Sequence, residues 1–129
     1  MSIELQMLLW AILLGLVHIL AGATFAIMQR GLMWAFGPRD GTPAPLTGVA
    51  ARLERASRNF LETFVFFAAA VLAVLLAQKT SEQTALGVQL YFWARLAYLP
   101  VYAAGISYLR TLIWAISLVG LAMVLLALL

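Results

Sequence analysis

Four long apolar stretches set strict limits on the fold of this 129-residue chain. They cover residues 3–28, 60–77, 85–104 and 111–129. Each is at or near the roughly 20 residues that an α-helix needs to cross about 30 Å of hydrocarbon. Strands of a membrane β-barrel alternate in polarity over about 10 residues, whereas these stretches are continuously apolar. The sequence therefore predicts an all-α integral membrane protein, built as a bundle of four transmembrane helices.

The composition supports one compact membrane unit. Hydrophobic residues make up 65% of the chain and charged residues only 10%, against about 25% charged residues in soluble domains. No repeat or low-complexity tract divides the sequence, so we expect a single membrane domain over residues 1–129. Its predicted spans cover about residues 3–29, 59–78, 85–104 and 109–129. A loop is predicted over about residues 30–57, where glycine and proline are frequent.

The positive charges are concentrated between the first two predicted spans. Five of the eight basic residues lie in or beside that connection: Arg30, Arg39, Arg52, Arg55 and Arg58. By the positive-inside rule this connection is cytoplasmic, so an even number of spans places both termini on the opposite side. The net charge of +3 therefore indicates a basic membrane face rather than nucleic-acid binding. For Arg39 and Lys79 we expect attraction to anionic lipid headgroups, at about 1 kcal/mol each.

A polar stripe enters the second apolar stretch. Four residues share an arc of about 80° on one helix face: Arg52, Arg55, Asn59 and Glu62. Arg58 lies at the margin of this arc, and Glu62 falls inside the apolar run, where a carboxylate costs on the order of 2.5 to 3.5 kcal/mol. One interpretation is a polar ligand site that opens to the cytoplasm. The alternative is that Arg55 or Arg58 pairs with Glu62 and that the stripe only holds helices together.

A second stripe lies on the third apolar stretch. Its members share an arc of about 60°: Tyr91, Arg95, Tyr98 and Tyr102. Arg110 follows at the start of the fourth span, where an arginine usually extends to the lipid headgroups. The basic and aromatic faces of two helices can also enclose an anion, because the guanidinium fork binds carboxylates through two hydrogen bonds.

Metal and thiol chemistry find little support in the sequence. The chain has no cysteine and a single histidine, so it offers neither a thiol nucleophile nor a cluster of metal ligands. We expect His18, in the middle of the first span, to form a hydrogen bond between helices rather than to bind haem or a metal.

Two segments resemble the MAPEG family, the membrane-associated proteins in eicosanoid and glutathione metabolism. The run RLERASRNFLET (52–63) is similar to that family's Arg-x-x-Arg-Ala-x-x-Asn-x-x-Glu signature. The run ARLAYLPVYAAGISYLRTLIW (94–114) is similar to its Arg-x-x-Tyr-x-x-x-Tyr segment, followed by an arginine at the fourth helix. The resemblance implies a homotrimer that binds glutathione between subunits near the cytoplasmic face. The compact chain looks like a bacterial member, which implies the inner membrane and periplasmic termini.

The resemblance also implies roles for individual residues. Those expected to bind glutathione as cosubstrate are Arg30, Arg52, Arg55, Asn59, Glu62, Arg95, Tyr98 and Tyr102, of which Arg30 matches by position only. Arg110 matches the arginine that stabilises the glutathione thiolate in catalytic members. The implied partner is a lipophilic electrophile or hydroperoxide dissolved in the bilayer. After the motif glutamate, Thr63 and Val65 stand where the eukaryotic synthases typically carry a tyrosine or other residue and a proline.

Two other functions fit parts of the pattern. A non-catalytic MAPEG-like protein would serve as a binding or accessory subunit of a larger membrane complex. A small multidrug-type exporter also has four short spans, but its carboxylate is expected well inside the first span. Here Glu4 lies at the start of that span and Glu62 lies in the second. We therefore expect a glutathione transferase or peroxidase ahead of both.

Overall fold

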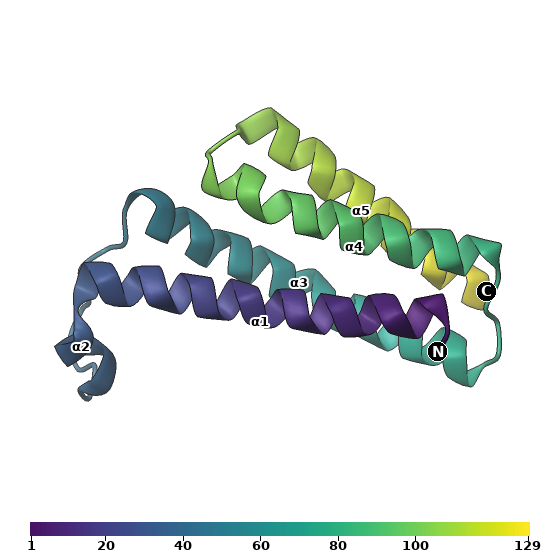
Figure 1. The fold of residues 1–129 in the computed structure, drawn as a ribbon, viewed down its shortest axis with the longest axis horizontal. Helices are drawn as coiled ribbons and strands as arrows, with labels where there is room; N and C mark the ends of the chain where they lie inside the picture. The colour runs from purple at the N-terminus through teal and green to yellow at the C-terminus, as the bar shows by residue number, and fades with distance from the viewer.

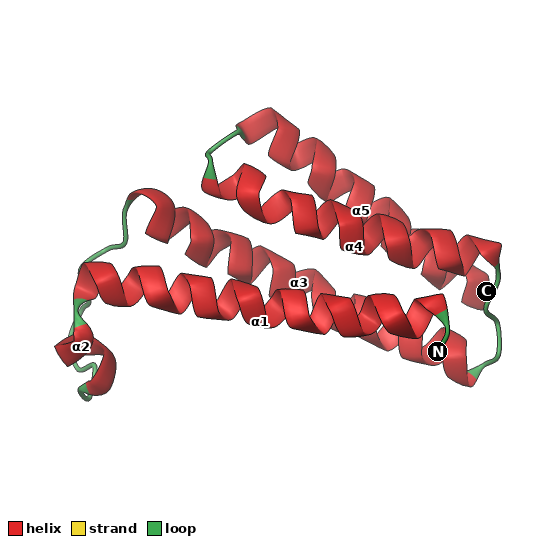
Figure 2. Cartoon of the chain, viewed as in Figure 1, coloured by secondary structure: helices red, strands yellow, loops and turns green.

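A computed structural model describes all 129 residues of the chain and contains five helices and no strands. In chain order the helices are α1 (Ile3–Arg30), α2 (Leu32–Phe36), α3 (Gly48–Leu76), α4 (Glu82–Ala103) and α5 (Ser107–Leu128). Figure 2 shows only helices and the loops between them. Four of the helices are long, and α2 is a piece of five residues beside the end of α1. The predicted all-α class is confirmed.

The four long helices run alternately in opposite directions (Figure 1). Both termini and the α3–α4 turn lie at one end of the molecule, while α2 and the α4–α5 turn lie at the other. α1 packs on α3 and α4 packs on α5, and α4 also contacts α1 and α3. α4 therefore contacts every other long helix.

Three of the helices, α1, α3 and α5, are long and apolar enough to cross a membrane. α4 has 22 residues, a sufficient length, but Gln89, Arg95 and three tyrosines lower its mean hydropathy. Its contacts on several sides suit this composition, because polar groups are costly next to lipid and are tolerated inside a bundle. The length and mean hydropathy of the helices thus support three of the four predicted spans.

The connection between the first two predicted spans is shorter than we expected. The sequence predicts a loop over about residues 30–57, but α3 begins at Gly48 and α2 forms inside this range. Pro43 and Pro45 keep the preceding segment out of a helix, since proline lacks the backbone N–H. Thr47 is still extended, with φ −130°, directly before α3. The polar stripe at residues 52–62 consequently lies wholly within a helix.

Close packing joins the helices at the centre of the bundle. Phe67 of α3 is fully buried, and the Tyr91 ring of α4 stacks on it with 3.9 Å between centroids. α4 and α5 meet at Gly87 and Gly120. A Cβ atom on Gly120 would lie 2.5 Å from the Gly87 carbonyl oxygen and 2.7 Å from the Tyr91 nitrogen. Only glycine fits there, and small residues are what permit such backbone contact between membrane helices.

Hydrogen bonds stabilise the end of the bundle where both termini lie. The buried Glu4 carboxylate accepts a bond of 2.8 Å from the Thr84 hydroxyl, which belongs to a capping box at the start of α4. Lys79 Nζ and Gln83 Nε2 donate to backbone carbonyl oxygens of α5. These bonds fix the turn between α3 and α4 against the two chain ends.

Candidate functional site

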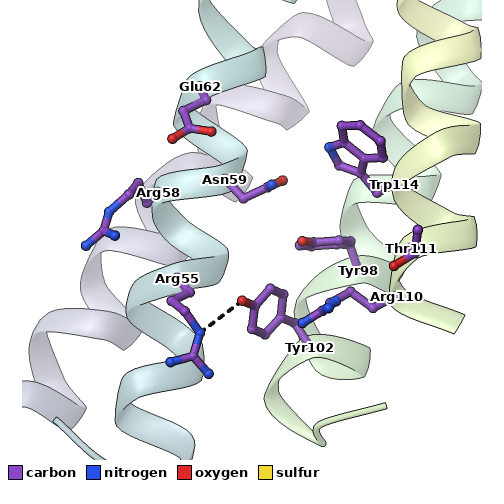
Figure 3. A pocket seen from close by; sticks show the side chains of 9 residues that line it. All are labelled: Arg55, Arg58, Asn59, Glu62, Tyr98, Tyr102, Arg110, Thr111 and Trp114. Carbon is purple, nitrogen blue, oxygen red and sulfur yellow. Dashed lines mark hydrogen bonds between the residues drawn. The ribbon is translucent and has the colours of Figure 1, made fainter. Parts of the chain in front are cut away.

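A polar cavity lies between α3 on one side and α4 and α5 on the other, at the end of the bundle remote from the termini (Figure 3). Its volume is about 460 Å³, within the usual range for small-molecule sites. Nine residues line it: Arg55, Arg58, Asn59, Glu62, Tyr98, Tyr102, Arg110, Thr111 and Trp114. Both stripes predicted from the sequence contribute to this lining.

α3 carries most of the charge of the cavity. Arg55, Asn59 and Glu62 recur every three or four residues, so they lie along one face of α3, and all three line the cavity. Arg55 Nε donates to the Tyr102 hydroxyl at 3.1 Å, a bond that joins α3 to α4 at one end of the cavity (Figure 3). The Arg58 side chain turns away from Asn59 in the same view and donates to Glu54, 3.1 Å away.

Glu62 has no ion-pair partner in the chain. The only ion pair joins Arg58 to Glu54, one helical turn earlier, while Arg55 binds a tyrosine. The predicted pairing of Arg55 or Arg58 with Glu62 is therefore wrong, although the stripe does join helices through the bonds of Arg55 and Asn59 to α4. Glu62 is exposed, so its carboxylate is available to a cationic group from outside the chain.

The opposite wall combines two tyrosines of α4 with the first turn of α5. The Tyr98 and Tyr102 rings meet edge to face, with centroids 5.5 Å apart. The guanidinium carbons of Arg110 and Arg55 lie 4.8 Å and 5.8 Å from the centre of the Tyr102 ring. Since an aromatic face attracts cations, Tyr102 holds arginines from two different helices around one end of the cavity.

Arg95 lies behind the cavity wall rather than in it. Its side chain is fully buried, and its Nη1 donates to Asn59 Oδ1 at 2.9 Å. The guanidinium carbon lies 4.3 Å from the centre of the Tyr98 ring. Tyr91, the remaining member of the second stripe, lies deeper still, with its hydroxyl 3.0 Å from Thr63 Oγ1.

Two other predicted binding residues do not reach the cavity. Arg52 Nε donates to the Ala103 carbonyl oxygen at 2.8 Å, beside the α4–α5 turn. Arg30 Nε donates to the Ala44 carbonyl oxygen at 2.9 Å, and Arg30 lines a separate small cavity near α2. Of the predicted site residues, the structure brings together Arg55, Asn59, Glu62, Tyr98, Tyr102 and Arg110. The other three, Arg30, Arg52 and Arg95, lie outside this lining.

Three lining residues were not among the predicted site residues: Arg58, Thr111 and Trp114. Arg58 lies at the margin of the arc that the other polar residues of α3 share. Trp114 follows Arg110 by four positions and so lies on the same helical face, a signal that charge and tyrosine spacing alone do not reveal. Thr111 belongs to neither polar stripe, so the sequence pattern does not indicate it.

The hydrogen bond between helices that we predict for His18 is absent from the structure. Its Nδ1 bonds to the Leu14 carbonyl oxygen at 2.9 Å within the same helix, and its Nε2 is buried without a partner. The imidazole instead stacks on Phe60 of α3, with centroids 4.6 Å apart. The contact that His18 makes between helices is therefore aromatic stacking and not a hydrogen bond.

The cavity can hold a ligand with charges of both signs. Three arginines supply paired N–H donors for carboxylates, and one glutamate supplies an acceptor for an ammonium group. Together with three helices able to cross a membrane, this makes the chain an integral membrane protein with a polar site at one end of its helical bundle.

A sequence profile of the MAPEG family matches residues 7–129, nearly the whole chain. The protein belongs to the MAPEG family. Both segments that resemble the family in sequence lie inside the matched range. A comparison with curated proteins gives no significant match.

Proposed function

We propose that this protein is a membrane-bound glutathione transferase that also reduces lipophilic hydroperoxides. Glutathione occupies the cavity between α3 and the α4–α5 pair, and Arg110 stabilises its thiolate. The thiolate attacks an electrophilic carbon of a substrate from the bilayer, so that a carbon–sulfur bond forms as the leaving group departs. When the substrate is a hydroperoxide, two glutathione molecules are oxidised to the disulfide, and the hydroperoxide is reduced to an alcohol and water. Family membership supports the general class, and the cavity supports the choice of ligand.

The observation that carries this proposal is the charge pattern of the cavity. Three arginines and one glutamate line it, and that glutamate has no partner of its own. Glutathione presents the complementary pattern, with two carboxylates and one ammonium group. Arg55 suits one carboxylate, Arg58, whose exposed ion pair with Glu54 is weak, suits the other, and Glu62 suits the ammonium group. A volume of about 460 Å³ is sufficient for a tripeptide.

Arg110 is well placed to favour a thiolate. A free cysteine thiol has a pKa near 8.5, and a neighbouring cation lowers it. Each unit of lowering corresponds to about 1.36 kcal/mol of preference for the charged form. Arg110 is only partly exposed and lies in the first turn of α5, where the peptide dipoles add positive potential. Both effects favour an anionic sulfur at this end of the cavity.

The arrangement in the membrane is also part of the proposal. We propose that α4 forms a fourth span, that the cavity end faces the cytoplasm, and that the termini lie in the periplasm of a bacterial inner membrane. The arginines around the α1–α3 connection support this orientation. We propose a homotrimer with sites at the subunit interfaces.

Titration of the detergent-solubilised protein with glutathione tests the proposed function. We expect saturable binding, a rise in thiolate absorbance at neutral pH, and conjugation of a lipophilic aryl halide. S-methylglutathione has no ionisable thiol, so it should bind without the absorbance change. Failure to obtain binding, absorbance and turnover at millimolar glutathione would overturn the proposal. Binding without turnover would instead indicate a non-catalytic binding or accessory subunit.

Glu62→Gln tests the assignment of the ammonium group. The variant should bind glutathione about three- to tenfold more weakly, because one charge-assisted contact of about 1 kcal/mol is lost at an exposed position. A glutathione analogue without the amino group is the matched control, and calorimetry should give the same Kd for it with both proteins. An equal loss for both ligands would place the ammonium group elsewhere.

A further inference from the structure

Arg95 carries a buried charge that no acidic residue compensates. Its side chain is 0% exposed, and the only ion pair of the chain lies elsewhere, between Arg58 and Glu54. Two of its nitrogens, Nε and Nη2, have no hydrogen-bond partner. An unpaired buried charge is strongly destabilising, and an apolar side chain would fill the same space without that penalty. A role in packing alone does not account for a guanidinium group at this position.

The one hydrogen bond of Arg95 sets the direction of a cavity residue. Its Nη1 donates to Asn59 Oδ1 at 2.9 Å. A guanidinium group has donors and no acceptor, so the amide atom that faces it has to be the oxygen. The amide nitrogen of Asn59 then points away from Arg95. Figure 3 shows this side chain pointing from α3 toward the wall that carries Tyr98 and Trp114.

Arg95 also contacts a lining residue of its own helix. Its guanidinium carbon lies 4.3 Å from the centre of the Tyr98 ring and 5.4 Å from that of Phe60. One buried side chain thus holds Asn59 on α3 and Tyr98 on α4, the two walls that face each other. Cation–π contacts of this kind are stronger when they are desolvated than at exposed sites.

We propose that Arg95 is a positioning residue, which turns the Asn59 amide so that its NH₂ group donates to a carbonyl or carboxylate oxygen of the ligand. This inference rests on the proposed function for the identity of the ligand, glutathione, but not for the orientation of the amide. It replaces direct ligand contact, the role implied for Arg95 by the resemblance, with an action through Asn59.

The orientation can be measured without any ligand. Asn59 is the only asparagine of the chain, so labelling asparagine side chains with ¹⁵N gives a single NH₂ signal in the NMR spectrum. Arg95→Met should shift this signal, because the amide oxygen loses its partner, and Arg95→Lys provides a second variant that keeps the charge. Arg55→Met removes a cavity arginine that does not bond to Asn59 and should leave the signal in place. An unchanged signal in both Arg95 variants would overturn the inference.

Glutathione binding tests the consequence for the site. Asn59→Ala and Arg95→Met should each weaken binding about three- to tenfold, the effect of one hydrogen bond. If Arg95 acts through Asn59, the double variant binds no more weakly than either single variant. Additive losses would show that Arg95 contacts the ligand directly and would overturn the inference. If the unmodified protein binds no glutathione, the proposed function fails, while the NMR measurement still decides the positioning role.

Asn59→Asp distinguishes an effect on ligand binding from an effect on the stability of the fold. Its carboxylate would pair with Arg95, so the variant should unfold at the same temperature as the unmodified protein or higher. It has no NH₂ group to offer, so glutathione binding should still fall about three- to tenfold. Unaltered affinity in a stable Asn59→Asp variant would contradict the inference.

Discussion

Arg110→Ala is expected to lower the rate of glutathione conjugation by a factor of about 10² to 10³, the usual effect of removing one group that stabilises a reacting anion. The guanidinium group is the only cation that the first turn of α5 contributes to the cavity. Without it, the bound thiol stays mostly protonated at neutral pH. The measurement is kcat/KM with a lipophilic aryl halide at saturating glutathione, alongside circular dichroism and size-exclusion chromatography to verify fold and assembly.

The pH dependence provides an independent test of the same substitution. In the unmodified protein the rate should already be near its plateau at pH 7, because the thiolate is formed there. In Arg110→Ala the rate should continue to rise toward the pKa of a free thiol, about 8.5, since the positive charge that favoured ionisation is gone. Arg39→Ala is the control, because Arg39 bonds to the Ala35 carbonyl oxygen outside the cavity. An Arg110→Ala variant with an unaltered rate and pH profile would contradict the assignment.

Gly120→Ala is expected to destabilise the fold by about 1 to 3 kcal/mol, although it adds a single methyl group. The new Cβ would lie 2.5 Å from the Gly87 carbonyl oxygen and 2.7 Å from the Tyr91 nitrogen. Both atoms belong to the backbone of α4, so no side-chain rotation relieves the clash and the two helices have to separate. Reversible unfolding in mixed detergent micelles measures the change in free energy.

Gly22→Ala is the matched control for that experiment. Gly22 also lies inside a long helix, but a Cβ there meets nothing within 4 Å. Alanine costs less conformational entropy than glycine in a helix, so this variant should equal the unmodified protein or exceed it by about 0.5 to 1 kcal/mol. If Gly120→Ala and Gly22→Ala unfold alike, α4 and α5 do not touch at this glycine pair.

The sequence predicted the long helices well where they are apolar and poorly where they are polar. The predicted first and last spans, about residues 3–29 and 109–129, differ by one or two residues from Ile3–Arg30 and Ser107–Leu128. The second predicted span begins about eleven residues after the start of α3, because residues 48–58 are rich in charge and hydropathy detects contact with lipid rather than helical backbone. α2 has five residues, too few to produce a helical period.

The cavity lining followed from helical periodicity, but the pairing of its charges did not. Arg58 is four residues from both Glu54 and Glu62, so spacing alone allows either partner. The structure selects Glu54, which precedes the arginine and so has the favourable order for a pair four residues apart. Arg55 and Arg95 likewise look equivalent in the sequence, yet one lines the cavity and the other lies behind it. That difference depends on how α3 packs on α4, which no single helix encodes.

The placement of the two chain ends has a practical consequence. Both lie at the end of the bundle away from the cavity (Figure 1). An affinity tag or fluorescent protein fused to either end would therefore stand clear of the ligand. Protein captured through such a tag on a sensor surface presents the cavity to the flowing solution. Reporters fused to the two ends would also lie at the same end of the bundle, so each fusion serves as a check of the other.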